Sequence, residues 1–143
     1  MSIWHQEVTA EEINQRAKNS LSDHLGIAFT EIGKNYLKAI MPIDKRTLQP
    51  MGIMHGGASC SLAETVASAA ANYCVDPTKE MCVGLNIFTN HIKAVKEGPV
   101  EAIARPIHLG RSTQVWEIEV YNPEQQLISV SRLTLAVLNK KQG

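Results

Sequence analysis

Glu64 is the residue of this sequence whose type and position most favour chemistry. In residues 47–78 it is, apart from Asp76 and with histidines set aside, the only acidic or basic side chain. Asp76 precedes Pro77, and an aspartate at such a turn is common. Glu64 instead lies among small and apolar residues, where a buried carboxylate is costly unless it is paired or used. We therefore take Glu64 as the leading functional residue.

Polar side chains accompany Glu64 along residues 56–75, a segment with many alanines and no proline. In a helix, residues three and four positions apart share a face. The polar residues at these spacings around Glu64 are Ser61, Thr65, Ser68 and Asn72. A narrow line of polar groups around one carboxylate indicates a wet cleft. The alternative is the exposed stripe of a solvated helix.

A glycine pair, Gly56 and Gly57, opens this helical segment. Backbone N–H groups at a helix start lack intrahelical partners, and the helix dipole makes that end positive. Such N–H groups can stabilise a developing oxyanion, and the nearby side chain of Gln49 can add a donor. The alternative is that the glycines only permit close packing, while His55 caps the helix or lies in the core.

Several other chemistries are disfavoured by the residue spacing. The histidines and cysteines include no H-x-x-x-H or C-x-x-C pair, so we expect no metal site. Neither a G-x-S-x-G elbow nor a phosphate-binding P-loop is present. The serines near Glu64 have no histidine at close helical spacing, which disfavours a serine nucleophile.

Composition excludes further classes of protein. Fourteen basic and fourteen acidic residues give a formal net charge of zero, without the basic excess of a nucleic-acid binder. No apolar stretch approaches the ~20 residues that cross a bilayer, and the first ten residues lack the apolar run of a signal peptide. Three cysteines without metal-ligand spacing are typical of small buried residues kept reduced. We expect a cytoplasmic protein that binds neither nucleic acid nor membranes.

The order of the predicted elements points to one domain over residues 1–143. Thr9 and Glu12 form a capping box that starts a short helix ending near residue 20. Runs of apolar and β-branched residues predict strands, and turn residues separate them. The expected strands are 26–32, 36–42, 81–94, 100–107, 114–121 and 126–138, the long helix is 56–75, and a frayed polar tail is 139–143.

Two strands before the long helix and four antiparallel strands after it predict an α+β fold. A single helix can cover only one face of a sheet, so the sheet is expected to wrap around it. The uncovered face or edge then needs a partner chain. We therefore expect self-association.

The string from Gln49 to Ser59, followed by Leu62-Ala63-Glu64, resembles a known family. It is similar to hotdog-fold acyl-CoA thioesterases of the 4-hydroxybenzoyl-CoA (Arthrobacter) type. The family includes 1,4-dihydroxy-2-naphthoyl-CoA thioesterases and the enterobactin-pathway proofreading thioesterases. The likeness extends nearly end to end, through His24-Leu25-Gly26-Ile27, Asn90-His91, His108-Leu109-Gly110-Arg111 and Ser131-Arg132-Leu133.

This resemblance implies a hotdog fold, hydrolysis of an aromatic acyl-CoA thioester, and a role for each matching residue. Glu64 would attack the thioester carbonyl or activate a water. The backbone N–H of Gly56 would polarise the thioester oxygen, Gln49 and His55 would position the thioester, and Ser68 would help to hold the water. The family's cleft lies between two subunits, so Glu64 of one chain would meet Gln49 and Gly56 of the other, in a dimer or a tetramer.

The resemblance also implies a set of residues that hold substrate and coenzyme A, which enters as part of the substrate rather than as a cofactor. Lys93 and Arg111 suit phosphates, although Lys93 stands where close relatives have arginine. An apolar central strand, with Leu85, Ile87 and Phe88, departs from relatives and bears on the acyl group. The substrate-binding set is Gly84, His91, Ile92, Lys93, Ala94, His108, Leu109, Gly110, Arg111, Ser112 and Thr113.

Two other functions stay open from the sequence. A non-catalytic acyl-CoA-binding module would keep the cleft without needing Glu64 and Ser68. A hotdog dehydratase acting on acyl-carrier-protein substrates would be expected to use a histidine together with a helix carboxylate. His55 lies before the helix, nine residues ahead of Glu64, and this arrangement favours the thioesterase.

Overall fold

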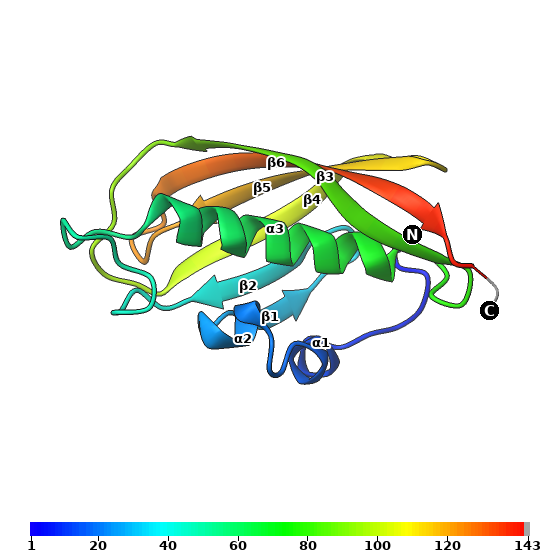
Figure 1. The fold of residues 1–143 in the computed structure, drawn as a ribbon, viewed down its shortest axis with the longest axis horizontal. Coiled ribbons are helices and arrows are strands. Elements are labelled where there is room, and N and C mark those ends of the chain that lie inside the picture. Colours follow the sequence, from blue (N-terminus) through cyan, green and yellow to red (C-terminus); the bar gives the residue numbers. More distant parts are fainter. Residues whose placement is uncertain (142–143) are drawn as a thin grey trace.

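The structure is a computed structural model that describes residues 1–141. Six antiparallel strands form one sheet that curls around the long helix α3 (Figure 1). The expected α+β hotdog fold is therefore confirmed. The elements are α1 (Ala10–Arg16), α2 (Leu21–His24), β1 (Ala28–Ile32), β2 (Leu37–Met41), α3 (Gly56–Tyr73), β3 (Glu80–His91), β4 (Val100–Leu109), β5 (Thr113–Tyr121) and β6 (Leu127–Asn139).

The strand order β1-β2-β4-β5-β6-β3 leaves β1 and β3 at the two edges of the sheet. Helix α3 lies in the concave face, and α1 and α2 lie beside β1 (Figure 1). The strand expected at residues 114–121 is confirmed as β5, in which Trp116, Ile118 and Val120 are buried while the residues between them are only half-buried. These side chains face the helix and form part of the hydrophobic core.

Small residues let α3 lie close against the sheet. Leu62, Val66 and Ala70 are fully buried, as are neighbouring alanines of the same helix. Alanine has the highest helix propensity and adds little bulk, so the backbone of α3 can approach the strands. This close packing fixes which side chains of α3 remain outside the core.

The predicted first helix is wrong in extent, although its start is confirmed. The Thr9 hydroxyl accepts from the N–H of Glu12 at 3.2 Å, and the Glu12 carboxylate accepts from the N–H of Thr9 at 2.8 Å. The helix ends at Arg16, and Asn19 has a left-handed backbone with φ 63°. Ser20 then caps the separate helix α2. The expected helix therefore stops short of residue 20, and α2 is a separate helix that was not predicted.

The ends of β3 and β6 also differ from the expectation. β3 ends at His91, after which the N–H groups of Ile92 and Lys93 donate to the carbonyl of Ile128. β6 continues to Asn139, and the Lys140 N–H donates to the Lys79 carbonyl at 2.8 Å. The expected frayed tail is thus held at its first two residues, and residues 142–143 lie outside the described range.

Membrane crossing by a helix finds no support. Across residues 1–141, every helix is too short or too polar to span a bilayer.

Candidate active site

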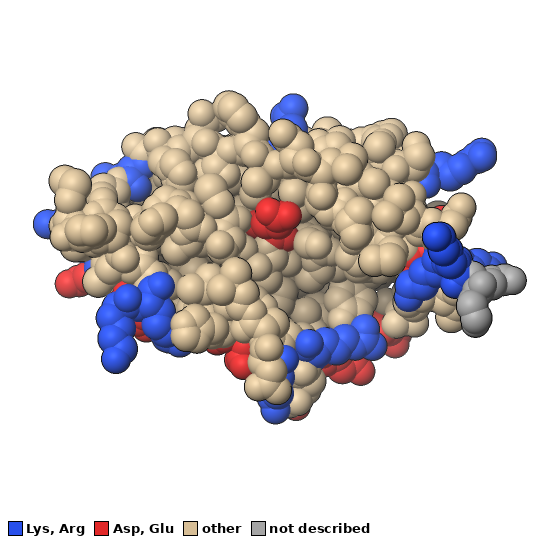
Figure 2. Space-filling model, in the orientation of Figure 1, with Lys and Arg blue, Asp and Glu red and all other residues tan. Residues whose placement is uncertain are grey.

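Glu64 lies at the middle of α3, on the helix face that is turned away from the core. Its side chain is exposed, and it makes no ion pair with any residue of the described chain. The face shown in Figure 2 has one acidic group at its centre. Helix α3 crosses this face, and its only acidic residue is Glu64. The polar face of α3 is therefore open to solvent at Glu64, and within one chain this carboxylate is not desolvated.

The edge strand β3 runs antiparallel beside α3 and meets the same helix face at several points. The Cys60 thiol lies 3.4 Å from the Thr89 hydroxyl, and the Asn72 side chain bonds both backbone groups of Cys82. Two further contacts are seen from where a Cβ atom on Gly56 or Gly84 would lie. In order along the helix, the facing pairs are Gly56 with His91, Cys60 with Thr89, Glu64 with Gly84, and Asn72 with Cys82.

Gly84 gives the carboxylate of Glu64 its space. A Cβ atom built on Gly84 would lie 2.7 Å from Oε2 of Glu64, closer than real Cβ contacts. A β-bulge between Gly84 and Asn86 shifts the register of β3 against β6 at this point. The structure thus brings Gly84, expected only to touch substrate, directly against the candidate catalytic carboxylate.

The start of α3 presents a free backbone donor. His55 is the N-cap, and its Nδ1 accepts from the N–H of Gly57 at 2.8 Å. The carbonyl of His55 accepts from Ala58 and Ser59. The N–H of Gly56 donates to no acceptor among residues 1–141. His55 is thus the helix cap that the sequence left open, and it leaves the Gly56 N–H available at the positive end of the helix.

A pocket of about 270 Å³ lies next to this helix start. The His91 ring borders it, and a Cβ on Gly56 would lie 3.2 Å from Cε1 and Nε2 of that ring. The side-chain oxygen of Gln49 accepts from the N–H of Met51, which leaves its amide N–H groups without an acceptor in the described chain. The predicted site residues that line the pocket are Gln49, Gly56, His91, Ile92, Lys93 and Ala94.

Glu64 and Gly56 do not meet within one chain. Eight residues separate them on a single helix, which corresponds to about 12 Å along its axis. A thioester carbonyl cannot contact both groups across that separation. The predicted catalytic set therefore falls into two clusters, one with Glu64 and Ser68, beside Gly84, and one with Gln49, His55 and Gly56.

Ser68 lies one helical turn beyond Glu64 and is half-buried. Its backbone carbonyl accepts from the side-chain amide of Asn72 at 2.9 Å, and its hydroxyl bonds no other group among residues 1–141. Ser68 and Glu64 share one face because residues four apart in a helix are neighbours. The structure therefore places Ser68 where a water beside the carboxylate could be held.

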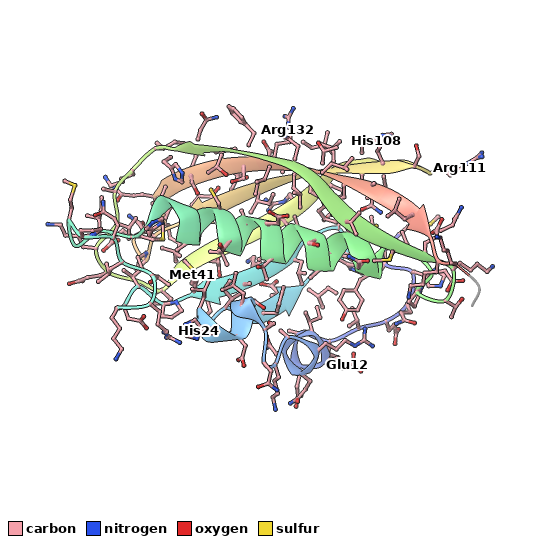
Figure 3. All side chains as sticks on the ribbon, in the orientation of Figure 1. Glu12, His24, Met41, His108, Arg111 and Arg132 are labelled. Carbon is pink, nitrogen blue, oxygen red and sulfur yellow. The ribbon has the colours of Figure 1, made fainter. Side chains whose placement is uncertain are left out.

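The predicted stretch from His108 to Thr113 forms the β4–β5 hairpin. His108 and Arg111 lie at the end of the sheet away from the start of α3 (Figure 3). The Gly110 N–H donates to the Thr113 carbonyl and the Ser112 carbonyl accepts from Val137, each at 2.9 Å. Leu109, Gly110, Arg111 and Ser112 are thus part of an ordered turn. Within one chain this turn and Lys93 lie at opposite ends of β3.

The thiols near the site are not suited to nucleophilic chemistry. Burial raises the pKa of Cys74 to about 12 and that of Cys82 to about 11, so both remain protonated at neutral pH. Only Cys82 is fully buried, so the expectation of three buried cysteines is wrong for Cys60 and Cys74.

No cluster of metal-ligating side chains forms in the part of the chain that the structure describes.

A second pocket, not predicted from the sequence, lies between α1 and α3. It has a volume of about 310 Å³, and Thr65 and Ala69 of α3 line it. These residues directly follow Glu64 and Ser68 in the helix. No sequence pattern could have predicted this pocket, because α1 and α3 are far apart in the sequence. The distance between them in space depends on how each helix packs on the sheet.

Comparison with known proteins identifies the family of this chain. Residues 51–129 match the model of the thioesterase superfamily. A putative esterase of Haemophilus influenzae is 46% identical over 137 residues, covering 96% of this chain and 99% of that protein. The 1,4-dihydroxy-2-naphthoyl-CoA hydrolase of Escherichia coli is 41% identical over 136 residues, covering 95% of this chain and 98% of the relative.

A solved structure supports the same assignment. A mutant thioesterase of Pseudomonas aeruginosa superposes with a TM-score of 0.96 at 43% identity, covering 97% of this chain and all of that one. The fold and these relatives therefore define a thioester hydrolase. The chain belongs to the thioesterase superfamily.

Proposed function

We propose that this protein hydrolyses an aromatic acyl-CoA thioester, with Glu64 as nucleophile or general base and the Gly56 N–H as oxyanion donor. The observation that carries this proposal is the free N–H of Gly56 at the positive end of an 18-residue helix whose only carboxylate is exposed. A developing oxyanion needs such a preorganised donor, and water or a thioester carbonyl needs a base or nucleophile. The named hydrolase among the relatives, which acts on a naphthoyl-CoA, supports the acyl class.

The proposed reaction balances by either route. As a general base, Glu64 takes a proton from water while the water oxygen attacks the thioester carbon. As a nucleophile, its carboxylate forms an anhydride that water then hydrolyses. In both routes the oxyanion accepts from the Gly56 N–H, the C–S bond breaks, and the thiolate of CoA leaves and is protonated. Ser68 would hold the water, and Gln49 would add a donor near the thioester.

Two copies of the chain would complete this site. β3 is an edge strand with an unpaired side, and its Leu85 and Phe88 side chains are 62% and 63% exposed. Long edge strands with apolar side chains favour pairing with another strand. Antiparallel pairing of two β3 strands about a two-fold axis near Ile87 and Phe88 would place Gly84 opposite His91 of the second copy.

That register would bring the separated catalytic clusters together. In each chain Glu64 lies beside Gly84, and Gly56 lies beside His91. Paired strands are about 4.8 Å apart, so Glu64 of one copy would approach Gly56 of the other. The same pairing would close a site on each side of the axis. A self-complementary interface of this kind is the usual basis of a two-fold dimer.

The same two-fold axis would also unite the predicted phosphate-binding residues. Thr113, next to Arg111, pairs with Ala136, which in turn pairs with Val83 near the start of β3. Lys93 follows the opposite end of β3, so Lys93 of the second copy would lie at the Val83 end. A guanidinium and an ammonium would then flank one CoA nucleotide.

A further pairing of dimers into a tetramer belongs to the same proposal, because Phe88, Ile107 and Leu109 remain exposed on β3 and β4.

A cytoplasmic setting is also part of this proposal. CoA thioesters are intermediates of cytoplasmic metabolism, and an enzyme that consumes them must share their compartment.

The sharpest test of the oxyanion donor replaces Gly56 by proline. Gly56 is the first residue of α3, a position where proline fits the helix, and His55 already has the extended backbone that precedes proline. Gly56→Pro removes the N–H, whereas Gly56→Ala adds a side chain and keeps the N–H. We expect Gly56→Pro to lower kcat by about 10²-fold or more relative to Gly56→Ala. Equal activity of the two variants would remove Gly56 from the mechanism.

Mixing two inactive variants tests the shared site. Unfolding and refolding Gly56→Pro together with Glu64→Gln would give mixed dimers that have one intact site and one doubly altered site. We expect recovery of about a quarter of the wild-type activity in an equal mixture, from random assortment of a two-fold dimer. No recovery, with mixed dimers shown by native mass spectrometry, would contradict a site between subunits.

Free-thiol release from a panel of aryl and aliphatic acyl-CoA thioesters tests the reaction itself. Hydrolysis of aryl thioesters is the expected result. Tight binding of acyl-CoA without thiol release would indicate a binding module, and hydration or dehydration of an acyl chain would indicate a dehydratase.

A further inference from the structure

The segment between β2 and α3 reaches the helix start through a bond to Thr47. The chain leaves β2 after Met41, forms a loop and returns to the start of α3 (Figure 1). The N–H of His55 donates to the Thr47 carbonyl at 2.8 Å, and Gly56 follows His55 directly. Thr47 is thus bonded to the residue that precedes the proposed oxyanion donor.

Thr47 is fully buried, although it is a polar residue. Its hydroxyl donates to the Pro42 carbonyl at 2.8 Å and accepts from the Asp44 N–H at 3.0 Å. Its own N–H donates to the Asp44 carbonyl at 2.9 Å. With the bond from His55, the hydroxyl, the N–H and the carbonyl of Thr47 all have partners. Such a residue holds its neighbours in one arrangement, because a displaced group would lose its partner without gaining water.

The hydroxyl of Thr47 connects the loop to the core of the sheet. β2 pairs with both β1 and β4, so it is an interior strand. Its residues Leu37, Ala39 and Met41 are fully buried. Because Pro42 directly follows β2, the bond from the Thr47 hydroxyl to the Pro42 carbonyl fixes the loop relative to a buried strand.

The peptide group between His55 and Gly56 carries the proposed oxyanion donor. The carbonyl of His55 and the N–H of Gly56 belong to this one planar group, so they point in opposite directions. That carbonyl accepts from the N–H groups of Ala58 and Ser59 at 3.0 and 3.2 Å. On the other side of His55, its N–H is bonded to Thr47. A shift of Thr47 would therefore turn His55 and redirect the Gly56 N–H, and an oxyanion donor must be aimed before the reaction begins.

We propose that Thr47 is a positioning residue for hydrolysis, whose buried hydroxyl fixes the direction of the Gly56 N–H. This inference rests on the proposed function, because that N–H is the proposed oxyanion donor. Thr47 does not line the pocket next to the helix start. It therefore acts through His55 and Gly56 and makes no contact with the substrate.

Thr47→Val removes the hydroxyl and nearly keeps the size of the side chain. The loop stays attached through backbone bonds such as that from the Met54 N–H to the Val95 carbonyl, so the variant should fold. A displacement of about 1 Å at a catalytic group can cost roughly 10²-fold in rate, and we expect kcat on an aryl acyl-CoA thioester to fall by about tenfold or more. KM should stay within about twofold of the wild type, because Thr47 does not contact substrate.

Thr47→Ser is the conservative variant, because it keeps the hydroxyl. It should keep at least about half of the wild-type kcat, since the bonds to Pro42 and Asp44 can still form. A kcat as low as that of Thr47→Val would show that the hydroxyl is not the group that matters.

A double-mutant cycle with Gly56→Pro separates positioning from a general loss of stability. If Thr47 acts through the Gly56 N–H, removing that N–H first leaves nothing to misplace. Thr47→Val should then lower the kcat of Gly56→Pro by about twofold or less. A loss of about tenfold in both backgrounds, or wild-type kcat in Thr47→Val alone, would overturn the proposal.

Thr78→Val is the matched control, because it makes the same chemical change at the other end of α3. The Thr78 hydroxyl donates to the Asp76 carboxylate at 2.7 Å in the turn between α3 and β3. This variant should keep the wild-type kcat. Thermal melts of all variants would show that each is folded under the assay conditions.

Amide hydrogen exchange separates this proposal from the proposed function. The His55 N–H is protected by its bond to the Thr47 carbonyl, so its exchange rate reports how firmly the helix start is held, without any substrate. We expect exchange to be about tenfold faster in Thr47→Val and unchanged in Thr47→Ser and Thr78→Val. Unchanged exchange in Thr47→Val would overturn the proposal. If no thioester is hydrolysed, the proposed function fails, and the exchange rate still decides whether the Thr47 hydroxyl fixes the start of α3.

Discussion

The carboxylate of Glu64 occupies the space that a side chain at Gly84 would fill, because a Cβ atom there would lie 2.7 Å from Oε2. Gly84 belongs to the edge strand β3, and the bulge that follows it shifts the register of that strand. The backbone of β3 thus approaches the carboxylate directly. This contact fixes the carboxylate relative to the strand edge at which a second copy is proposed to pair.

Gly84→Ala should therefore displace the carboxylate of Glu64 while leaving the fold intact. The clash is with the end of a flexible side chain, so the side chain will turn rather than the strand move. A displacement of about 1 Å at a reacting group can cost roughly 10²-fold in rate. Steady-state kinetics should show a large loss in kcat, and a thermal melt should show little change.

Asn86→Ala is the control for that variant, because Asn86 also lies on β3 but lines a pocket on the other face of the sheet. Its kcat should stay close to that of the wild type. Wild-type kcat in Gly84→Ala would show that the contact with Glu64 has no bearing on the reaction.

Removing the carboxylate itself should abolish most of the hydrolysis. Neither Glu64→Gln nor Glu64→Ala can attack a carbonyl or take a proton efficiently, and losing such a group typically costs 10²–10⁴-fold. Because Glu64 is exposed and unpaired within residues 1–141, the free energy of unfolding should change by about 0.5 kcal/mol or less. Thiol release would measure the loss of hydrolysis, and urea denaturation would measure the free energy of unfolding.

Glu97→Gln provides the comparison for that loss, since Glu97 is an exposed carboxylate of the loop after β3. It should retain full activity. Near wild-type kcat in Glu64→Gln would end the catalytic assignment.

A single-turnover reaction in ¹⁸O-labelled water would distinguish the two chemical routes, because only an anhydride intermediate can leave label in Glu64.

Arg111 and Lys93 should affect substrate binding rather than the chemical step. Both side chains are exposed, and they lie at ends of β3 that only a second copy would bring together. Contacts to phosphates far from the carbonyl supply binding that is equal in the ground and transition states, so their loss raises KM. Arg111→Ala and Lys93→Ala should each raise KM for a CoA thioester, with a smaller change in kcat.

An N-acetylcysteamine thioester lacks the nucleotide and is the matched substrate for this test. The effect of both variants should largely vanish with it. Equal losses on the full and the truncated thioesters would show that neither residue contacts phosphate.

The sequence predicted the elements that depend on local patterns. The alternation around Trp116 and the long proline-free helix both fix their elements by periodicity, and the structure confirms them. The first helix was overextended, because the left-handed backbone at Asn19 has no periodic signal. The end of β3 was misplaced for a related reason, since the carbonyl of Ile128 redirects the chain after His91.

The candidate site was predictable in its residues but not in its arrangement. Helical spacing identified the polar face around Glu64, and the glycine pair indicated the helix start. The approach of Gly84 to the carboxylate depends on a bulge in β3, and the pocket between α1 and α3 depends on how α1 packs. Both are tertiary contacts between distant segments, which no local pattern encodes.

Asn72 should couple the stability of the molecule to its activity. Its side-chain oxygen accepts from the Cys82 N–H at 2.8 Å, and its amide donates to the carbonyls of Cys82 and Ser68 at 3.1 and 2.9 Å. Asn72→Ala leaves the groups of Cys82 without these partners, so the free energy of unfolding should fall by about 1–3 kcal/mol. Urea denaturation would measure this loss.

The same substitution should lower kcat. Asn72 of α3 bonds Cys82 near the start of β3, and Cys82 lies two residues before Gly84. Loosening this tie lets β3 shift along the helix, and Gly84 then no longer faces Glu64 in one position. Asn90→Ala alters the other end of β3, at an exposed residue whose own side chain bonds no residue of α3 within residues 1–141, and should leave stability nearly unchanged. If Asn72→Ala loses stability but keeps its kcat, the register of β3 along α3 does not position the carboxylate.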